Sequence, residues 1–140
     1  MRAKVVLCNC KGLCPSFQQA DMNTLPFHLE SELDVEYSVL HPQLCGQGGN
    51  AVLGELMSEA ARDPDTVLFV GACAPEAQQK LFKKLMRSTG LRESQFVPID
   101  IRGTDNDGIV ERLRKEVAKV VADRSSAAKP SATEPPSPPP

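Results

Sequence analysis

The sequence predicts a single α/β domain in which a four-stranded, mostly parallel sheet has helices on both faces. Two observations lead to this prediction. Four short apolar runs alternate with four stretches of helical spacing, and turn residues bound each run. The 140 residues, 41% of them hydrophobic, are enough for one core of ordinary size but not for two.

The predicted strands are rich in β-branched and apolar residues, and they cover residues 3–8, 35–40, 66–73 and 95–101. The stretches between and after them repeat apolar residues at intervals of three or four, which predicts four helices. The apolar positions of these helices, in chain order, are Leu25, Leu29 and Leu33; Val52, Leu53, Leu56, Met57 and Ala60; Leu81, Phe82, Leu85 and Met86; and Ile109, Val110, Leu113, Val117 and Val120.

The strand–helix order therefore repeats four times. Each crossover must return the chain to the same end of the sheet, so the strands are expected to be mostly parallel, as in Rossmann or flavodoxin-like domains. Helix starts support this interpretation: Pro26 lies near a first helical position and Pro75 just inside the third helix. Asp107 is expected to cap the last helix.

The end of the chain differs in composition from the rest. Residues 125–140 read "SSAAKPSATEPPSPPP", and six of the last eleven residues are proline. Such a segment has too little apolar surface to fold. We therefore expect an ordered domain over 1–124 followed by a disordered Pro-rich tail over 125–140.

Charge and targeting signals narrow the class of partner. The formal net charge is -2 without a basic run, which argues against nucleic acid and membrane surfaces. The apolar run at the start of the chain is short and is interrupted by Asn9 and Lys11, so we predict neither a signal peptide nor membrane insertion. The protein is expected to be cytoplasmic. In that reducing compartment, five cysteines indicate metal binding or redox chemistry more than a disulfide framework.

The cysteines follow the predicted strands. Cys8 closes the first strand and Cys10 opens the loop after it, Cys45 follows the second strand, and Cys73 ends the third. The carboxyl ends of parallel strands gather along one edge of a sheet, where doubly wound folds bind their ligands. Four thiols that are distant in sequence are thus expected to meet there. Cys14, in the first loop, would join them or compete with one of them.

Four convergent thiolates favour an iron–sulfur cluster, which is an anion and needs compensating charge. The helices after Cys45 and Cys73 would direct their positive N-terminal ends toward it. In "CGQGG", Gly46, Gly48 and Gly49 would offer backbone amides, with unusual dihedral angles and close approach to sulfur. An ordinary flexible turn is the alternative for these glycines.

Other kinds of chemistry fit the same residues. In a thiol–disulfide redox enzyme, Cys8 or Cys10 would be the nucleophile, and Cys14 or Cys45 would resolve the intermediate. A structural zinc site would use the same ligand type. The cysteines could also be small buried hydrophobic residues, Cys73 in particular.

Several segments resemble a known family. "VVLCNCKG", "LCGQGG" and "FVGACAPEAQQKLFKKLMRSTGL" followed by "FVPIDIR" are similar to the N-terminal iron–sulfur domain of the flavin-binding subunit of heterodisulfide reductase and its relatives, over about residues 4–120. The resemblance implies a [4Fe-4S] cluster that relays electrons in anaerobic metabolism, within complexes of flavin- and iron–sulfur-containing subunits. It implies an electron-transfer role more than a catalytic one. By position, the cluster ligands would be Cys8, Cys10, Cys45 and Cys73.

The chain departs from that family in two places. Many relatives have a further cysteine after the Ile-Arg pair, where this chain has "IRGTDND" with Asp105, and Cys14 stands where relatives usually have another residue. No G-x-G-x-x-G follows a predicted strand, so we expect a detached module without the flavin-binding body. A more distant resemblance is to the [2Fe-2S] delta subunit of methyl-viologen-reducing hydrogenases, which leaves the cluster type open.

Overall fold

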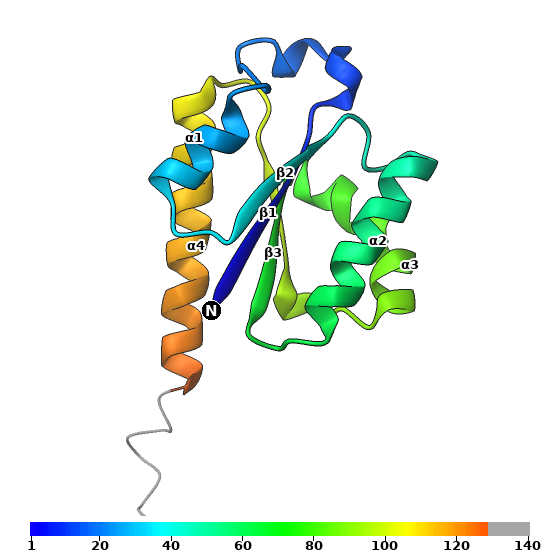
Figure 1. Cartoon of the computed structure of the whole chain (residues 1–140), viewed down its shortest axis with the longest axis vertical. Helices are drawn as coiled ribbons and strands as arrows, with labels where there is room; N and C mark the ends of the chain where they lie inside the picture. Colours follow the sequence, from blue (N-terminus) through cyan, green and yellow to red (C-terminus); the bar gives the residue numbers. More distant parts are fainter. Residues whose placement is uncertain (129–140) are drawn as a thin grey trace, which may run out of the picture.

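Four parallel strands form one sheet, in the order β2-β1-β3-β4 (Figure 1). The computed structural model describes residues 1–128 of the chain. All three neighbouring pairs of strands are parallel, which confirms the predicted α/β domain with a parallel sheet. The strands are β1 (Arg2–Cys8), β2 (Tyr37–His41), β3 (Thr66–Ala72) and β4 (Phe96–Asp100).

Four helices cover both faces of this sheet, as predicted. α1 and α4 lie on one face, while α2 and α3 lie on the other (Figure 1). Three short 3₁₀ turns, at Cys10–Gly12, Pro15–Phe17 and Glu93–Gln95, complete the secondary structure of the described residues. The helices are α1 (Leu25–Glu32), α2 (Gln47–Ala61), α3 (Pro75–Thr89) and α4 (Asn106–Ala128).

The strand order places a topological switch point between β1 and β3. From β1 the chain moves to β2 on one side, and it then crosses back to add β3 and β4 on the other side. This is the order of the first four strands of a flavodoxin-like sheet, in which ligands bind outside the carboxyl ends of the strands at the switch point. In this chain, Cys8 and Cys73 lie beside that position.

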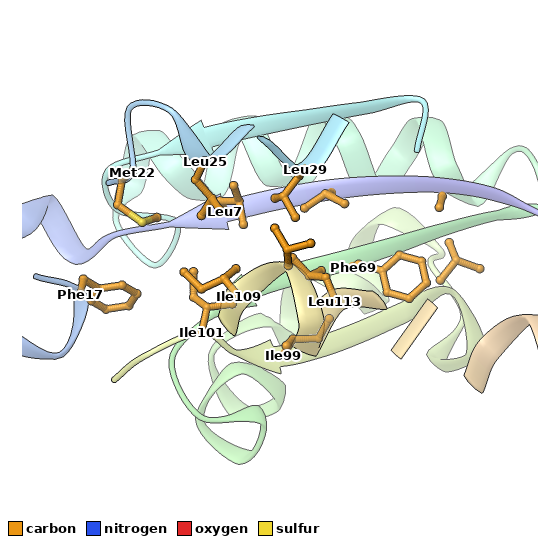
Figure 2. Close-up of a cluster of buried hydrophobic side chains, with 14 residues drawn as sticks. Leu7, Phe17, Met22, Leu25, Leu29, Phe69, Ile99, Ile101, Ile109 and Leu113 are labelled. Atoms are coloured by element: carbon orange, nitrogen blue, oxygen red, sulfur yellow. The ribbon is translucent and has the colours of Figure 1, made fainter. Parts of the chain in front are cut away.

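Each face of the sheet has its own core. On the α1 and α4 face, Phe69 of β3 packs in a cluster with Leu29 and Leu113, and Phe17 and Met22 extend this cluster toward the carboxyl ends of the strands (Figure 2). On the other face, Phe82 meets Phe96 edge to face, with ring centroids 6.3 Å apart. Burial of each such side chain stabilises the fold by about 2 kcal/mol.

The ends of the helices agree with the sequence prediction at two of three positions. Pro26 and Pro75 occupy the first turns of α1 and α3, as predicted. The predicted cap of the last helix, Asp107, lies instead within the first turn of α4. Asp105 is the cap, because its Oδ1 accepts a hydrogen bond of 2.9 Å from the Gly108 amide.

The last helix extends past the predicted boundary of the domain. α4 continues to Ala128, four residues beyond the predicted end at 124. The rest of the predicted Pro-rich tail, 129–140, lies outside the described residues. Within residues 1–128, no helix is long and apolar enough to span a bilayer.

Candidate functional site

The sheet brings the cysteines to one edge. Cys8 is the last residue of β1 and Cys10 begins the turn that follows, Cys45 lies in the loop between β2 and α2, and Cys73 comes directly after β3. Because the strands are parallel, these positions share the carboxyl edge of the sheet, which we call the thiol edge. All five cysteines are free thiols: Cys8 is buried, Cys10, Cys14 and Cys73 are partly buried, and Cys45 is exposed.

The thiols are close enough to affect one another electrostatically. Partial burial raises the pKa of the Cys10 thiol above its usual value of 9.0, and the four other cysteines raise it further. Burial likewise raises the pKa of Cys73, to which Cys8 and Cys45 add smaller contributions. Thiolates at this edge would repel one another, and a bound metal cation would relieve the repulsion.

Hydrogen bonds join the loops after β1 and β2. The Lys11 amide donates to the Pro42 carbonyl at 2.6 Å. The Leu44 amide donates to Cys8 Sγ at 3.5 Å, and Cys8 Sγ donates to the Pro42 carbonyl at 3.9 Å. The loop that carries Cys45 is therefore held against the end of β1.

A buried glutamine fixes the third segment. Gln78 of α3 is fully buried, and its Nε2 donates to the carbonyls of Cys73 at 2.8 Å and Ile99 at 3.1 Å. Its Oε1 has no partner within residues 1–128. One side chain thus ties the backbone after β3 to β4 and to α3.

Left-handed backbone occurs in the first loop of this edge. The φ angles of Cys10, Lys11 and Gly12 are 51°, 58° and 72°. For a residue other than glycine this conformation costs about 1–2 kcal/mol. A strained backbone persists only where the surrounding structure holds it in place. Such residues cluster at functional sites.

The unusual dihedrals predicted for Gly46, Gly48 and Gly49 are wrong, because none of the three has a positive φ. Gly46 is the N-cap of α2, with φ -82°. At Gly49 a Cβ atom would collide with the backbone of Gln43 and Leu44, so this glycine lets α2 pack against its own preceding loop. At Gly48, a Cβ atom would point into open space in the described part of the chain.

Two helices begin at the thiol edge, as predicted. α2 starts at Gln47, shortly after Cys45, and α3 starts at Pro75, shortly after Cys73. The N-terminus of each helix carries a partial positive charge. Both helices thus favour negative charge near these two cysteines.

Sequence reasoning missed Arg102, which follows β4. Its pKa is raised above its usual range, first by the hydrogen bond and charge of Asp100 and then, more weakly, by Cys73 and Cys14. The fourth segment at this edge therefore contributes a cation, while the other segments contribute thiols. The sequence signal was the "DIR" at the end of the fourth apolar run, but its proximity to the cysteines depends on the strand order.

The donor chemistry fits a thiolate-bound metal, although the sulfurs do not converge on one point. Within residues 1–128, no group of three or more His, Cys, Asp or Glu side chains is arranged to hold a metal ion. Cys10 and Cys14 pack against the core on the α1 and α4 face, and Cys8 packs on the opposite face. Metal binding would therefore require thiol side chains to rotate, and Cys8 would give up its hydrogen bond to Pro42.

Comparisons with known proteins add no assignment. The chain matches no protein-family model, and no curated protein is significantly similar to it.

Proposed function

We propose that this protein is an iron–sulfur electron-transfer subunit of a heterodisulfide reductase-like redox complex. Cys8, Cys10, Cys45 and Cys73 would hold a [4Fe-4S] or [2Fe-2S] cluster, and Cys14 would be a fifth thiol at the same edge that is not a ligand. The observation that supports this proposal is that loops following three different strands bring five free thiols to one edge of the sheet. Soft thiolate sets of this kind select iron–sulfur clusters or zinc.

The role of the chain would be to hold the cluster and set its surroundings. When bound, the cluster would accept one electron and release it again. The donor would be a reduced flavin- or iron–sulfur-containing subunit, and the acceptor a second iron–sulfur centre. Cys45 is exposed, so this side of the site would face a partner, as transfer between proteins requires. The N-termini of α2 and α3 would offset the negative charge of the cluster.

The segments that resemble heterodisulfide reductase support the partner class. They include the C-x-C of Cys8 and Cys10 and the "GACAPE" around Cys73. We propose on this basis a cytoplasmic complex of flavin- and iron–sulfur-containing subunits, without nucleic acid.

The rival function, thiol–disulfide exchange, fits the surroundings of the thiols less well. A nucleophilic cysteine needs access to its substrate and a lowered pKa. Cys8 is only 5% exposed, and its thiol is hydrogen-bonded to the backbone. At Cys10, the second candidate nucleophile, the pKa is raised.

Anaerobic isolation of the full chain tests the proposal. We expect a brown protein that contains iron and acid-labile sulfide, with visible absorption that dithionite bleaches. A colourless, iron-free protein that turns over a disulfide substrate would establish the rival. Zinc without sulfide would also overturn the proposal, since it would make the site structural.

A further inference from the structure

The segment after β4 lies between two cysteine-bearing segments. The amide of Ile101 donates to the Ala72 carbonyl at 3.1 Å, which joins this segment to the residue before Cys73. The amide of Gly103 donates to the Ser16 carbonyl at 2.6 Å, in the turn that follows Cys14. Arg102 stands between these two hydrogen bonds. Its backbone is thus fixed at the thiol edge from both sides.

Asp100 holds the side chain of Arg102. The guanidinium donates from Nε to Oδ1 at 3.0 Å and from Nη2 to Oδ2 at 2.9 Å, and the Arg102 amide donates to the same Oδ1 at 3.0 Å. This two-point contact is the strong form of an arginine–carboxylate pair. The Arg102 side chain is 37% exposed, so solvent screens its charge only in part.

A second arginine fixes the loop from α4. Nη1 of Arg112 donates to the carbonyls of Asp100 and Arg102, both at 2.8 Å. The group of Asp100, Arg102 and Arg112 holds two guanidinium cations and one carboxylate, so its formal charge is positive. By contrast, Lys11, the cation within the first cysteine loop, is exposed to solvent.

We propose that Arg102 is the fixed counter-charge of the thiol edge and raises the reduction potential of the centre held there. This inference rests on the proposed iron–sulfur function. An arriving electron adds one negative charge, and a fixed cation stabilises the reduced form more than the oxidised form. The arginine keeps its proton throughout, so electron uptake at this edge needs no accompanying proton from Arg102.

The test is a redox titration of the anaerobically isolated full chain, with the midpoint potential read from the visible absorption. Arg102→Gln is expected to shift the potential downward. Arg102→Lys keeps the charge but loses the two-point contact, so its potential should lie between those of Arg102→Gln and the natural chain. Arg124→Gln is the matched control. It removes the same charge at the opposite end of the sheet, where Arg124 donates to the Pro64 carbonyl, and its potential should equal that of the natural chain.

The outcomes separate this inference from the proposed function. If the natural chain contains no iron and sulfide, the proposed function fails. If all variants hold iron and sulfide and Arg102→Gln has the potential of Arg124→Gln, the role of Arg102 is overturned while the proposed function stands. Should Arg102→Gln fail to fold, judged by urea unfolding, the test passes to Arg102→Met, which also removes the charge. Its potential must then lie below that of the natural chain, and an unchanged value overturns the inference.

Discussion

A buried glutamine lies at each end of the sheet, and the two glutamines differ in how many of their polar atoms are hydrogen-bonded. At the amino ends of the strands, Gln95 uses both polar atoms of its side chain: Oε1 accepts from the Arg92 amide, and Nε2 contacts three carbonyl oxygens. At the carboxyl ends, Gln78 donates to two carbonyls, and its Oε1 has no partner within residues 1–128. The three carbonyls at Gln95 belong to Ala60, Asp63 and Thr66.

The difference extends to the surrounding residues. Two of the three unpartnered buried side-chain atoms in the described chain, Asn9 Oδ1 and Gln78 Oε1, lie at the carboxyl edge. The strained backbone of Cys10 and Lys11 lies there as well. Buried polar groups without partners and strained dihedrals cost stability, and proteins retain them mainly at functional sites. Among the described residues, the carboxyl edge thus keeps more of these costly features than the amino edge does.

Replacement of Gln95 should have the largest effect on stability. Gln95→Leu keeps the size of the side chain but removes its hydrogen bonds and leaves three carbonyls, two of them at buried hydrogen bonds, without this donor. We expect the free energy of unfolding to fall by about 4 kcal/mol, a large part of the stability of a small domain. Urea unfolding measures this loss. Gln79→Leu, on the exposed side of α3, is the control and should change stability by less than about 0.5 kcal/mol.

At the carboxyl edge, Gln78→Leu should cost less. It removes two hydrogen bonds, and the unpartnered Oε1 disappears with the side chain. The expected loss is about 2 kcal/mol in the same urea experiment. An equal or larger loss than for Gln95→Leu would contradict the contrast between the two edges.

Two glycines near the cysteines allow a comparison of strained backbone with ordinary backbone. Neither Gly12 nor Gly48 has a neighbour within 4 Å of a Cβ position in residues 1–128, but only Gly12 has a positive φ. Gly12→Ala should therefore destabilise the protein by about 1 kcal/mol. Gly48→Ala should stabilise it by about 0.5 kcal/mol, since alanine restricts the unfolded chain without strain in α2. Thermal unfolding of the two variants measures the direction of each change in stability. A change in the same direction for both variants would contradict the left-handed turn at Gly12.

The smallest effect concerns Tyr37, whose hydroxyl is the third unpartnered atom and lies at the amino edge. Burial, with Glu59 and Glu36 nearby, raises its pKa from 10.0 to about 12. The unfolded chain therefore loses the phenolic proton first, and stability should decline as the pH rises from 10 to 12. Tyr37 is the only tyrosine and the chain has no tryptophan, so ultraviolet absorbance of the phenolate reports it alone. A midpoint of phenolate formation near pH 10 in the folded protein would contradict the raised pKa. Tyr37→Phe should not show this loss of stability between pH 10 and 12.

Much of the fold was predictable because burial on both faces leaves a clear pattern. The central strands β1 and β3 are mostly apolar and buried, since helices cover both sides of them. The alternation with helices then indicates parallel strands. It does not fix the order β2-β1-β3-β4, which depends on which strands pair across the sheet.

The candidate site was predictable in part, for the same reason. Residues after parallel strands share an edge, so the positions of Cys8, Cys45 and Cys73 followed from the element order. Arg102 did not, because its approach to Cys73 requires that β4 lie beside β3. Positive φ angles at Cys10 and Lys11 leave no signal in residue type, whereas the glycine-rich segment after Cys45 suggested such angles where there are none.

The most direct test of the central claim is the iron content of single serine variants, isolated anaerobically beside the natural chain. We predict that Cys8→Ser, Cys10→Ser, Cys45→Ser and Cys73→Ser each lower the iron and sulfide content, while Cys14→Ser, the matched control, retains both. If Cys45→Ser and Cys73→Ser hold as much iron as the natural chain, the loops after β2 and β3 do not share a metal with β1, and the proposed cluster site at this edge is contradicted.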